Sequence, residues 1–266
     1  MEPSIQEQMI QFSQKHFPDY LIRYLKYPIV LKILNKLLCI SEIIELENKL
    51  GVLKNFELAD ALLNHSGLTY TVENLEKIPA EGRLLIAANH PLGGADWLFI
   101  LQFIRTVRQD VKVVINKDVN TLIVNLRDLF IPVSSYAKFN EQSRITIGEC
   151  LEKEEAVIIF PAGGISVMTR RGVADRKWKN GVTYFSRDHH ADVLPVFIGG
   201  RFSLFYYFCP ERLRRFLVVR NLLHPAFKKI KIVIGDTISH KEIPEGSDIS
   251  GFTLRLRSAT YRLGKE

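Results

Sequence analysis

Short apolar runs, separated by segments long enough to form helices, dominate the chain from about residue 83 onward. Runs of four to eight apolar residues bounded by polar ones are typical of buried strands. The predicted strands are residues 83–88, 111–115, 129–133, 156–160, 193–197 and 230–234. Strands that alternate with helices predict an α/β fold, in which a mixed sheet is flanked by helices.

The first part of the chain has a different pattern and predicts an N-terminal helical segment. We expect this segment to cover residues 1–66 and a catalytic domain to cover residues 67–266. Residues 20–38 are rich in apolar and aromatic side chains, but four basic residues interrupt them, so a membrane-spanning helix is not expected. Amphipathic helices broken near Pro28 fit the pattern, either lying on a bilayer or capping the catalytic core.

Composition and net charge indicate which classes of binding partner to expect. The chain has 266 residues, of which 47% are hydrophobic, and a formal net charge of +7. The hydrophobic content excludes a disordered class, and the charge favours anionic partners such as a phospholipid surface, coenzyme A or an acyl carrier protein. The basic residues follow no recognition-helix or zinc-finger pattern, so nucleic acid is not an expected partner.

The cysteines and the N-terminus bear on the compartment. Cys39, Cys150 and Cys209 are too few and too scattered for a disulfide framework or a zinc site, which favours a reducing compartment. Residues 1–14 are polar and lack the basic start and apolar core of a signal peptide. We therefore expect a peripheral protein at the cytoplasmic face of the membrane.

Candidate chemistry lies in the sequence Asn-His-Pro-Leu-Gly-Gly-Ala-Asp at residues 89–96, between an apolar strand and an apolar helix. His90 follows the strand, at the sheet edge where ligands collect in open α/β sheets. A histidine can take a proton from an attacking hydroxyl while a carboxylate such as Asp96 holds its ring, which suits acyl transfer. Taken singly, Asp96 is also explained as a helix N-cap and His90 as a satisfied polar side chain.

A second loop, Phe-Pro-Ala-Gly-Gly-Ile-Ser at residues 160–166, also follows a buried strand. The amides around Gly163 and Gly164 are candidates to hold a phosphate or a developing oxyanion, with Arg170 and Arg171 in support. The alternative is a simple turn. Ser166 does not stand in a G-x-S-x-G elbow, which weakens a serine hydrolase interpretation.

Three further stretches carry charge or aromatic side chains. Residues 175–181 combine a carboxylate, cations and a tryptophan, and for most of these charges we favour a solvated basic face. Residues 201–208 join Arg201 to an aromatic run that fits an acyl channel, a lipid contact or ordinary core. The arginines between 212 and 220 predict a basic helix that could meet phospholipid.

With these motifs in order, the chain resembles the glycerolipid and lysophospholipid acyltransferase superfamily, and particularly its bacterial hemolysin-like branch. The family's N-H-(four residues)-D block is matched by Asn89, His90 and Asp96, although five residues separate His90 from Asp96 here. The F-P-E-G-T-R-S block is matched by four residues, with Ala162 in place of the glutamate: Phe160, Pro161, Gly163 and Ser166. A buried strand at 193–196 resembles the fourth block, and the resemblance spans roughly residues 68–235.

The resemblance implies an O-acyltransferase that moves a fatty acyl group from acyl-carrier protein or coenzyme A onto a lysolipid hydroxyl. It implies His90 as general base, Asp96 as its orienting partner, and no metal or redox cofactor. The family's second block often has a lysine or arginine on an anion-binding loop, and Lys117 and Arg127 are the candidates for that cation here. The missing glutamate makes glycerol phosphate a doubtful acceptor and favours a lysophospholipid or an amino-acid lipid such as a lyso-ornithine or lyso-glycine lipid.

Two other functions fit the same residues. A thioesterase or lipid hydrolase would use water in place of the alcohol at the dyad. A non-catalytic lipid-binding protein would keep the fold without acceptor recognition, and Ala162 gives this option weight. The presence of both His90 and Asp96 counts against it.

Overall fold

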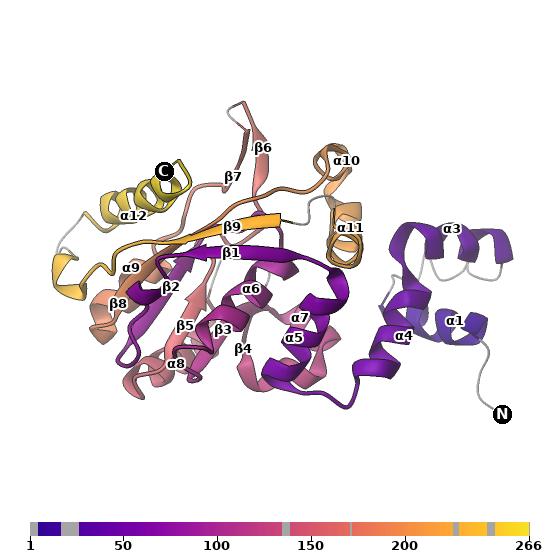
Figure 1. Cartoon of the computed structure of the whole chain (residues 1–266), viewed down its shortest axis with the longest axis horizontal. Coiled ribbons are helices and arrows are strands. Elements are labelled where there is room, and N and C mark those ends of the chain that lie inside the picture. Colours follow the sequence, from indigo (N-terminus) through magenta and orange to yellow (C-terminus); the bar gives the residue numbers. More distant parts are fainter. Residues whose placement is uncertain are drawn as a thin grey trace.

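The computed structural model describes residues 5–16, 27–134, 139–170, 172–225, 229–243 and 248–265. Its centre is a seven-stranded sheet with the order β1-β9-β8-β2-β5-β3-β4 (Figure 1). The strands are β1 (Thr69–Glu73), β2 (Leu84–Ala88), β3 (Val111–Asn116), β4 (Phe130–Val133), β5 (Ala156–Ile159), β8 (Asp192–Ile198) and β9 (Lys229–Ile234). Neighbours pair in parallel except β8 and β9, which are antiparallel. The predicted α/β fold with a mixed sheet is confirmed.

Strand β2 is a continuous run of apolar residues because both of its faces are buried. Leu84, Ile86 and Ala88 belong to the hydrophobic core on one face of the sheet, and Leu85 and Ala87 to the core on the other. All five residues are buried because β2 lies between β8 and β5 and both of its faces are covered.

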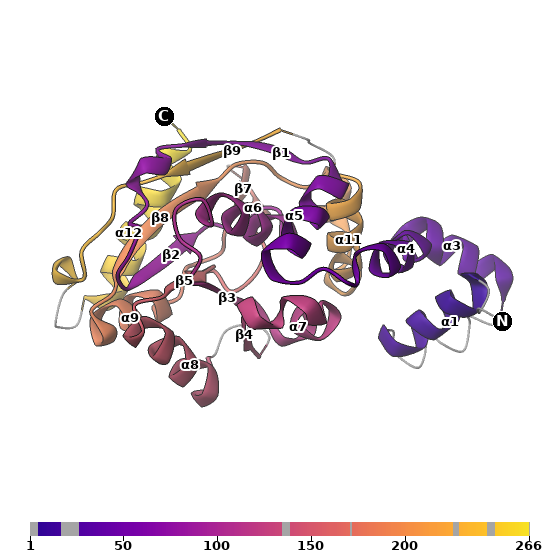
Figure 2. The ribbon, with the colours of Figure 1, turned by 60° about the horizontal axis from the view of Figure 1, so that its bottom comes forward.

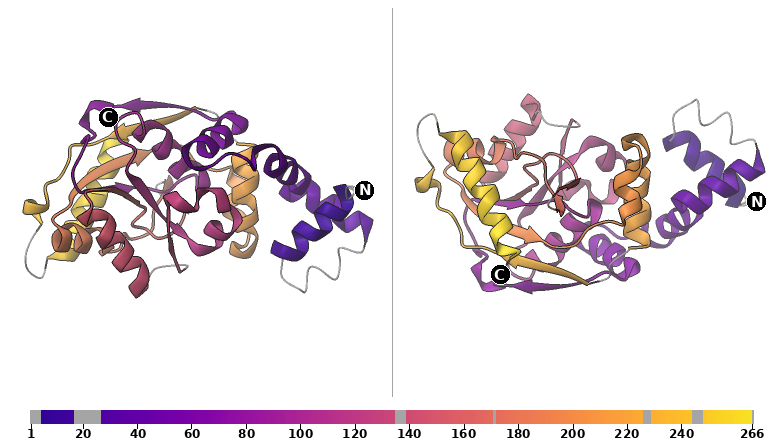
Figure 3. Two further views of the ribbon diagram at one scale, coloured as in Figure 1. Left: turned by 90° about the horizontal axis from the view of Figure 1, so that it is seen from below. Right: turned by 90° about the horizontal axis from the view of Figure 1, so that it is seen from above.

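Helices cover both faces of the sheet (Figures 2 and 3). On one face, α5 (Asn55–Ser66) and α6 (Gly94–Ile104) share a core with the sheet. On the other lie α8 (Glu141–Glu152), α9 (Gly181–His189) and α12 (Ile249–Leu263). Shorter elements are α7 (Lys117–Leu122) and the 3₁₀ turns η1 (Leu75–Lys77), η2 (Val124–Leu129) and η3 (His240–Glu242).

The N-terminal elements are helical, as expected: α1 (Ile5–His16), α3 (Pro28–Leu38) and α4 (Ile40–Leu50). They extend to one side of the sheet in Figure 1, and α3 contacts α11 (Glu211–Leu223), which follows α10 (Leu204–Phe208). Residues 20–26 of the predicted amphipathic segment lie outside the described residues. No helix in the described ranges is long and apolar enough to cross a membrane.

Helix α5 bears on the predicted division at residue 66. Its residues Leu58, Ala59 and Leu63 are buried in the same core as β2 and α6. The last N-terminal helix therefore packs on the sheet, while the two-domain description stays a prediction.

Two parts of the fold were not predicted. Strand β1 pairs with β9 at the edge of the sheet, and its side chains alternate between exposed and half-buried. A small antiparallel hairpin of β6 (Val167–Thr169) and β7 (Gly172–Ala174) projects from the body of the molecule in Figure 1.

Candidate active site

His90 and Asp96 form a hydrogen-bonded pair at the end of β2. His90 Nδ1 lies 2.9 Å from Asp96 Oδ2, and the Leu92 N–H donates to the same oxygen, also at 2.9 Å. Asp96 lies in the first turn of α6 and its side chain is 0% exposed, whereas that of His90 is 16% exposed. Because an ionised carboxylate only accepts, this bond puts a proton on Nδ1 and leaves the Nε2 lone pair available to take one.

The carboxylate of Asp96 is fully buried. Burial raises the pKa of Asp96 above its ordinary value, and the hydrogen bond from His90 and the one from the Leu92 amide act against that rise. Its other oxygen, Oδ1, is buried and has no hydrogen-bond partner among the described residues. An under-satisfied buried carboxylate is unfavourable for folding but well suited to stabilise an imidazolium beside it.

Gly93 lets the longer loop bring the two groups together. Its φ is 60° and its ψ is −119°, a conformation that side chains with a Cβ rarely adopt. A Cβ at this position would also stand 2.9 Å from side-chain carbons of Ile165 and Val218. The extra residue between His90 and Asp96 is thus accommodated at the glycine that forms the N-cap of α6.

The loop at 160–166 packs directly against the dyad. The rings of His90 and Phe160 are stacked, with centroids 4.1 Å apart and planes inclined by 26°. The Ser166 N–H donates to the His90 carbonyl at 2.8 Å. The carboxyl ends of the neighbouring strands β2 and β5 therefore carry a single two-loop site.

The two glycines of this loop differ. The Gly163 N–H donates to the Phe160 carbonyl at 2.9 Å and closes the turn, so it does not face a ligand. Beside Gly164, a Cβ would meet no heavy atom within 4 Å, which marks open space. Pro161 and Ala162, in the same loop, are buried. Of the two predicted amides, that of Gly164 therefore stays the candidate, because Gly164 lies beside open space.

Asp175, which the sequence predicted only as part of a charged stretch, is buried behind the dyad. Its Oδ1 accepts from the His90 N–H at 3.1 Å and from Ser166 Oγ at 2.5 Å. Its Oδ2 accepts from Trp178 Nε1 at 2.8 Å. Asp175, which is 4% exposed, is thus an exception to the solvated face expected for most charges of this stretch, whereas Arg176 and Lys177 are exposed.

Lys179 brings a cation to the same loop. Its N–H donates to the Pro161 carbonyl at 2.9 Å. Its Nζ lies 2.6 Å from the place where a Cβ on Gly163 would stand, and partial burial lowers the pKa of its ammonium group. The sequence signal for Asp175 and Lys179 is weak: an acidic residue and a tryptophan stand among the cations of residues 175–179.

Two residues predicted to bind substrate are engaged inside the fold instead. The Asn89 side chain donates to the Ile198 carbonyl at 2.8 Å and accepts from the Ile198 N–H at 2.7 Å, which ties β2 to β8. Ser166 is buried against Asp175. Since both ends of the Asn89 amide and the Ser166 hydroxyl are used, these side chains shape the loops rather than face a ligand.

The cations that were predicted to bind substrate lie outside the two loops of the site. Lys117 begins α7 at the carboxyl end of β3, at the same sheet edge as His90, and is exposed. Arg170 is exposed in the turn of the β6–β7 hairpin, and Arg171 lies outside the described residues. Arg127 is exposed in η2.

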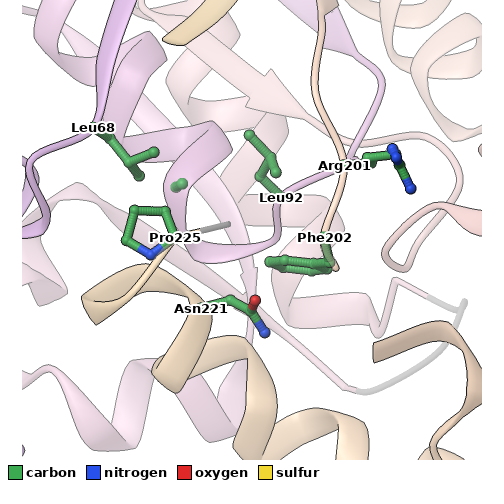
Figure 4. A pocket seen from close by; sticks show the side chains of 7 residues that line it. Leu68, Leu92, Arg201, Phe202, Asn221 and Pro225 are labelled. Carbon is green, nitrogen blue, oxygen red and sulfur yellow. The ribbon is translucent and has the colours of Figure 1, made fainter. Parts of the chain in front are cut away.

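A small pocket adjoins the dyad loop (Figure 4). Its lining is mostly apolar, with one cation at its edge: Leu68, Leu92, Ala95, Arg201, Phe202, Asn221 and Pro225. Leu92 and Ala95 belong to the loop and helix that carry His90 and Asp96. The pocket therefore places apolar side chains beside the His90–Asp96 pair.

Within the described ranges, one group of side chains has metal-ligand chemistry. Cys39, Glu42 and His224 place one potential ligand atom each within 4.8 Å of one another, where α4 meets the end of α11. Arg220 donates to Cys39 Sγ at 3.5 Å, and His224 Nε2 lies 2.7 Å from Glu42. The guanidinium already supplies a positive charge there, which opposes a metal cation.

This geometry agrees with the comparisons to known proteins. A family model described as acyltransferase matches residues 7–228. The chain belongs to this acyltransferase family. The match runs from within α1 to just beyond α11 and includes the dyad loop and the loop at 160–166.

Two relatives with the same named activity are similar to this chain. The acyltransferase is 30% identical over 196 residues to a lyso-glycine lipid O-acyltransferase of Bacteroides thetaiotaomicron, covering 73% of this chain and 68% of the relative. It is 26% identical over 194 residues to a lyso-glycine lipid O-acyltransferase of Phocaeicola vulgatus, covering 73% and 66%. The matched region thus spans about two thirds of each relative's length.

A solved structure supports the fold. The chain is similar to the crystal structure of the 1-acyl-sn-glycerophosphate acyltransferase PlsC from Thermotoga maritima, with a TM-score of 0.51 and 15% sequence identity. The similarity covers 97% of this chain and 87% of that one. At this identity the likeness establishes the architecture alone.

Proposed function

We propose that this acyltransferase transfers a fatty acyl group from an acyl thioester to a hydroxyl of an amino-acid lysolipid, with a lyso-glycine lipid as its acceptor. The observation that carries the proposal is the hydrogen-bonded pair of His90 and Asp96 in a chain similar to two lyso-glycine lipid O-acyltransferases. Ala162, in place of a glutamate associated with glycerol-phosphate acceptors, supports an acceptor without that phosphate.

In the proposed mechanism, His90 Nε2 takes the proton of the acceptor hydroxyl as its oxygen attacks the thioester carbonyl carbon. The imidazolium that forms is stabilised by Asp96 through Nδ1. When the tetrahedral intermediate collapses, the carbon–sulfur bond breaks and the thiolate takes the proton back from Nε2. The products are an ester and a free thiol, and His90 returns to its starting state.

Two groups of the 160–166 loop complete the proposed site. The Gly164 amide, beside open space, is the proposed donor to the carbonyl oxygen that becomes an oxyanion. Lys179, whose ammonium group stands over Gly163, is proposed to bind the carboxylate of the acceptor. A glycine joined to a lipid through its amine keeps a free carboxylate, and a Lys ammonium is a suitable partner for it.

The proposed donors are acyl-acyl carrier protein and acyl-coenzyme A, and the pocket beside Leu92 and Phe202 is proposed to hold the start of the acyl chain. The five-residue spacing between His90 and Asp96 and the Gly199-Gly200-Arg201 sequence, which follows the fourth-block strand, both resemble the hemolysin-like branch and support membership of that branch.

A membrane surface is the proposed location. On α3, Ile29, Ile33 and Leu37 are exposed at every fourth position, so they form one apolar stripe on a single face. Exposed Lys32 and Lys36 flank that stripe. This pattern is typical of helices that lie in an anionic bilayer surface. The cytoplasmic face remains a prediction.

A second exposed apolar group lies on α10, where Leu204, Phe205 and Phe208 are 51%, 62% and 80% exposed. Helices α3 and α10 both contact α11. Both apolar groups therefore lie on helices next to α11, and we propose that they face the membrane together.

The test is an acceptor panel. Purified protein is incubated with a radiolabelled acyl thioester and vesicles that contain lyso-glycine lipid, lysophosphatidic acid or no acceptor. We expect label in an O-acylated glycine lipid and much less in phosphatidic acid. Label only in phosphatidic acid would contradict the acceptor, and label only in free fatty acid would establish a thioesterase.

A further inference from the structure

Asp175 is a second buried carboxylate close to the dyad, and it touches both loops of the site. It follows the β6–β7 hairpin and is 4% exposed. One oxygen accepts from the backbone of His90 and the hydroxyl of Ser166, and the other accepts from the indole of Trp178. A single side chain therefore joins the dyad loop to the 160–166 loop.

Asp175 is itself held from the opposite side. Its N–H donates to Tyr261 Oη at 2.7 Å, and Arg257 Nη2 donates to its carbonyl at 2.8 Å. Both partners lie on α12, and the Arg257 guanidinium stands over the Tyr261 ring at 4.7 Å. The long C-terminal helix thus anchors the carboxylate that contacts His90.

Burying a carboxylate is costly unless its oxygens are satisfied. Asp175 meets three donors, two at Oδ1 and one at Oδ2, so both of its oxygens serve as acceptors. An asparagine here would point an NH₂ group at either the indole N–H or the His90 N–H. The electrostatic consequence also reaches the dyad, because the charge of Asp175 adds to the factors that raise the pKa of Asp96.

We propose that Asp175 is a positioning residue that fixes the main chain of His90 against the 160–166 loop. It acts on the chemical step through His90 and does not touch the reacting atoms. The proposal rests on the proposed role of His90 as general base. A displacement of the base by about 1 Å is enough to cost roughly 100-fold in rate, so loss of this contact should lower kcat more than it changes KM.

The test compares Asp175→Asn with Trp178→Phe. Trp178→Phe removes only the Oδ2 donor and leaves the His90 contact, so it measures the structural share of the network. We expect Asp175→Asn to lower kcat roughly 10- to 100-fold with little change in KM. Trp178→Phe should lower the melting temperature but keep kcat near the wild-type value. If Asp175→Asn does not fold, Asp175→Glu, which keeps the charge but moves the oxygens, carries the same expectation.

A readout independent of any acceptor separates this proposal from the proposed function. Amide hydrogen exchange at His90, followed by NMR, should be at least roughly tenfold faster in Asp175→Asn than in wild type and unchanged in Trp178→Phe. Wild-type exchange at His90 in the Asp175 variant, or an equal loss of kcat in both variants, would overturn the positioning role. Absence of acyl transfer by the wild-type protein would instead count against the proposed function.

Discussion

The imidazole of His90 stacks face to face on the ring of Phe160, with centroids 4.1 Å apart. The two residues are seventy positions apart in the sequence and meet because β2 and β5 are parallel neighbours. With one ring face against Phe160 and Nδ1 bound to Asp96, the imidazole has little freedom to rotate. This restraint is what a general base needs in order to meet a hydroxyl in one orientation.

Replacement of Asp96 by asparagine separates activity from stability. Asp96 Oδ2 accepts from both His90 Nδ1 and the Leu92 N–H, so the amide oxygen would take its place, but a neutral amide does not stabilise the imidazolium as a carboxylate does. We therefore expect kcat to fall by roughly 10²- to 10⁴-fold. If Asp96 were only a helix cap, asparagine would serve nearly as well. Steady-state acyl transfer measures the effect, and near-normal kcat would rule out the orienting role.

Asp96→Asn is also expected to keep or raise the thermal stability of the protein. Burial raises the pKa of Asp96 in the folded state. The stabilisation linked to this group is full below its unfolded pKa and is lost as pH rises through the folded pKa. At neutral pH the charged form is therefore a cost, and Asp96→Asn should melt at or above the wild-type temperature. A large drop in melting temperature would contradict this account of the site.

Gly93→Ala should be destabilising. The positive φ is unfavourable for alanine, and the new Cβ would stand 2.9 Å from carbons of Ile165 and Val218. We expect a loss of about 1–3 kcal/mol in the free energy of unfolding, measured by chemical denaturation. Gly164→Ala is the matched control, because its Cβ meets no heavy atom within 4 Å. Equal stability of the two variants would refute the proposed loop constraint.

Much of this fold could be predicted from sequence, because buried strands such as β2, β5 and β8 are apolar on both faces. Edge strand β1, with the sequence Thr-Tyr-Thr-Val-Glu, lacks that signal. Its partner β9 lies more than 150 residues later, so nothing local indicates the pairing. An exposed edge needs no continuous apolar run.

The dyad could likewise be predicted, since His90 and Asp96 share one short segment. Asp175 could not, because it stands among cations in a sequence typical of a solvated surface. What makes it buried is supplied from elsewhere in the chain, by the His90 amide and by Tyr261 on α12. Sequence patterns report local periodicity and carry no direct record of such distant contacts.

Lys179→Gln tests the proposed grip on the acceptor carboxylate. A charge-assisted contact contributes about 1.5–3 kcal/mol, so KM for lyso-glycine lipid should rise roughly 10- to 100-fold. The exposed neighbour Lys177, changed to glutamine, is the control. With the methyl ester of the acceptor the two variants should behave alike. An undiminished Lys179→Gln effect on the ester would disprove carboxylate binding.

The apolar stripe of α3 is tested with Ile33→Ser. Ile33 is 59% exposed within the stripe, whereas Val52, at 84%, lies outside it and gives Val52→Ser as control. Loss of one inserted apolar side chain should weaken binding to anionic vesicles on the order of tenfold, as measured by flotation. Equal binding by both variants would argue that α3 does not meet the bilayer.

The most direct test of the central claim is acyl transfer by His90→Ala, measured with a radiolabelled thioester and lyso-glycine lipid in vesicles. We predict that transfer falls by roughly 10²- to 10⁴-fold while the melting temperature and vesicle binding stay close to wild type. Transfer by a folded His90→Ala protein at the wild-type rate would contradict the assignment of His90 as the general base.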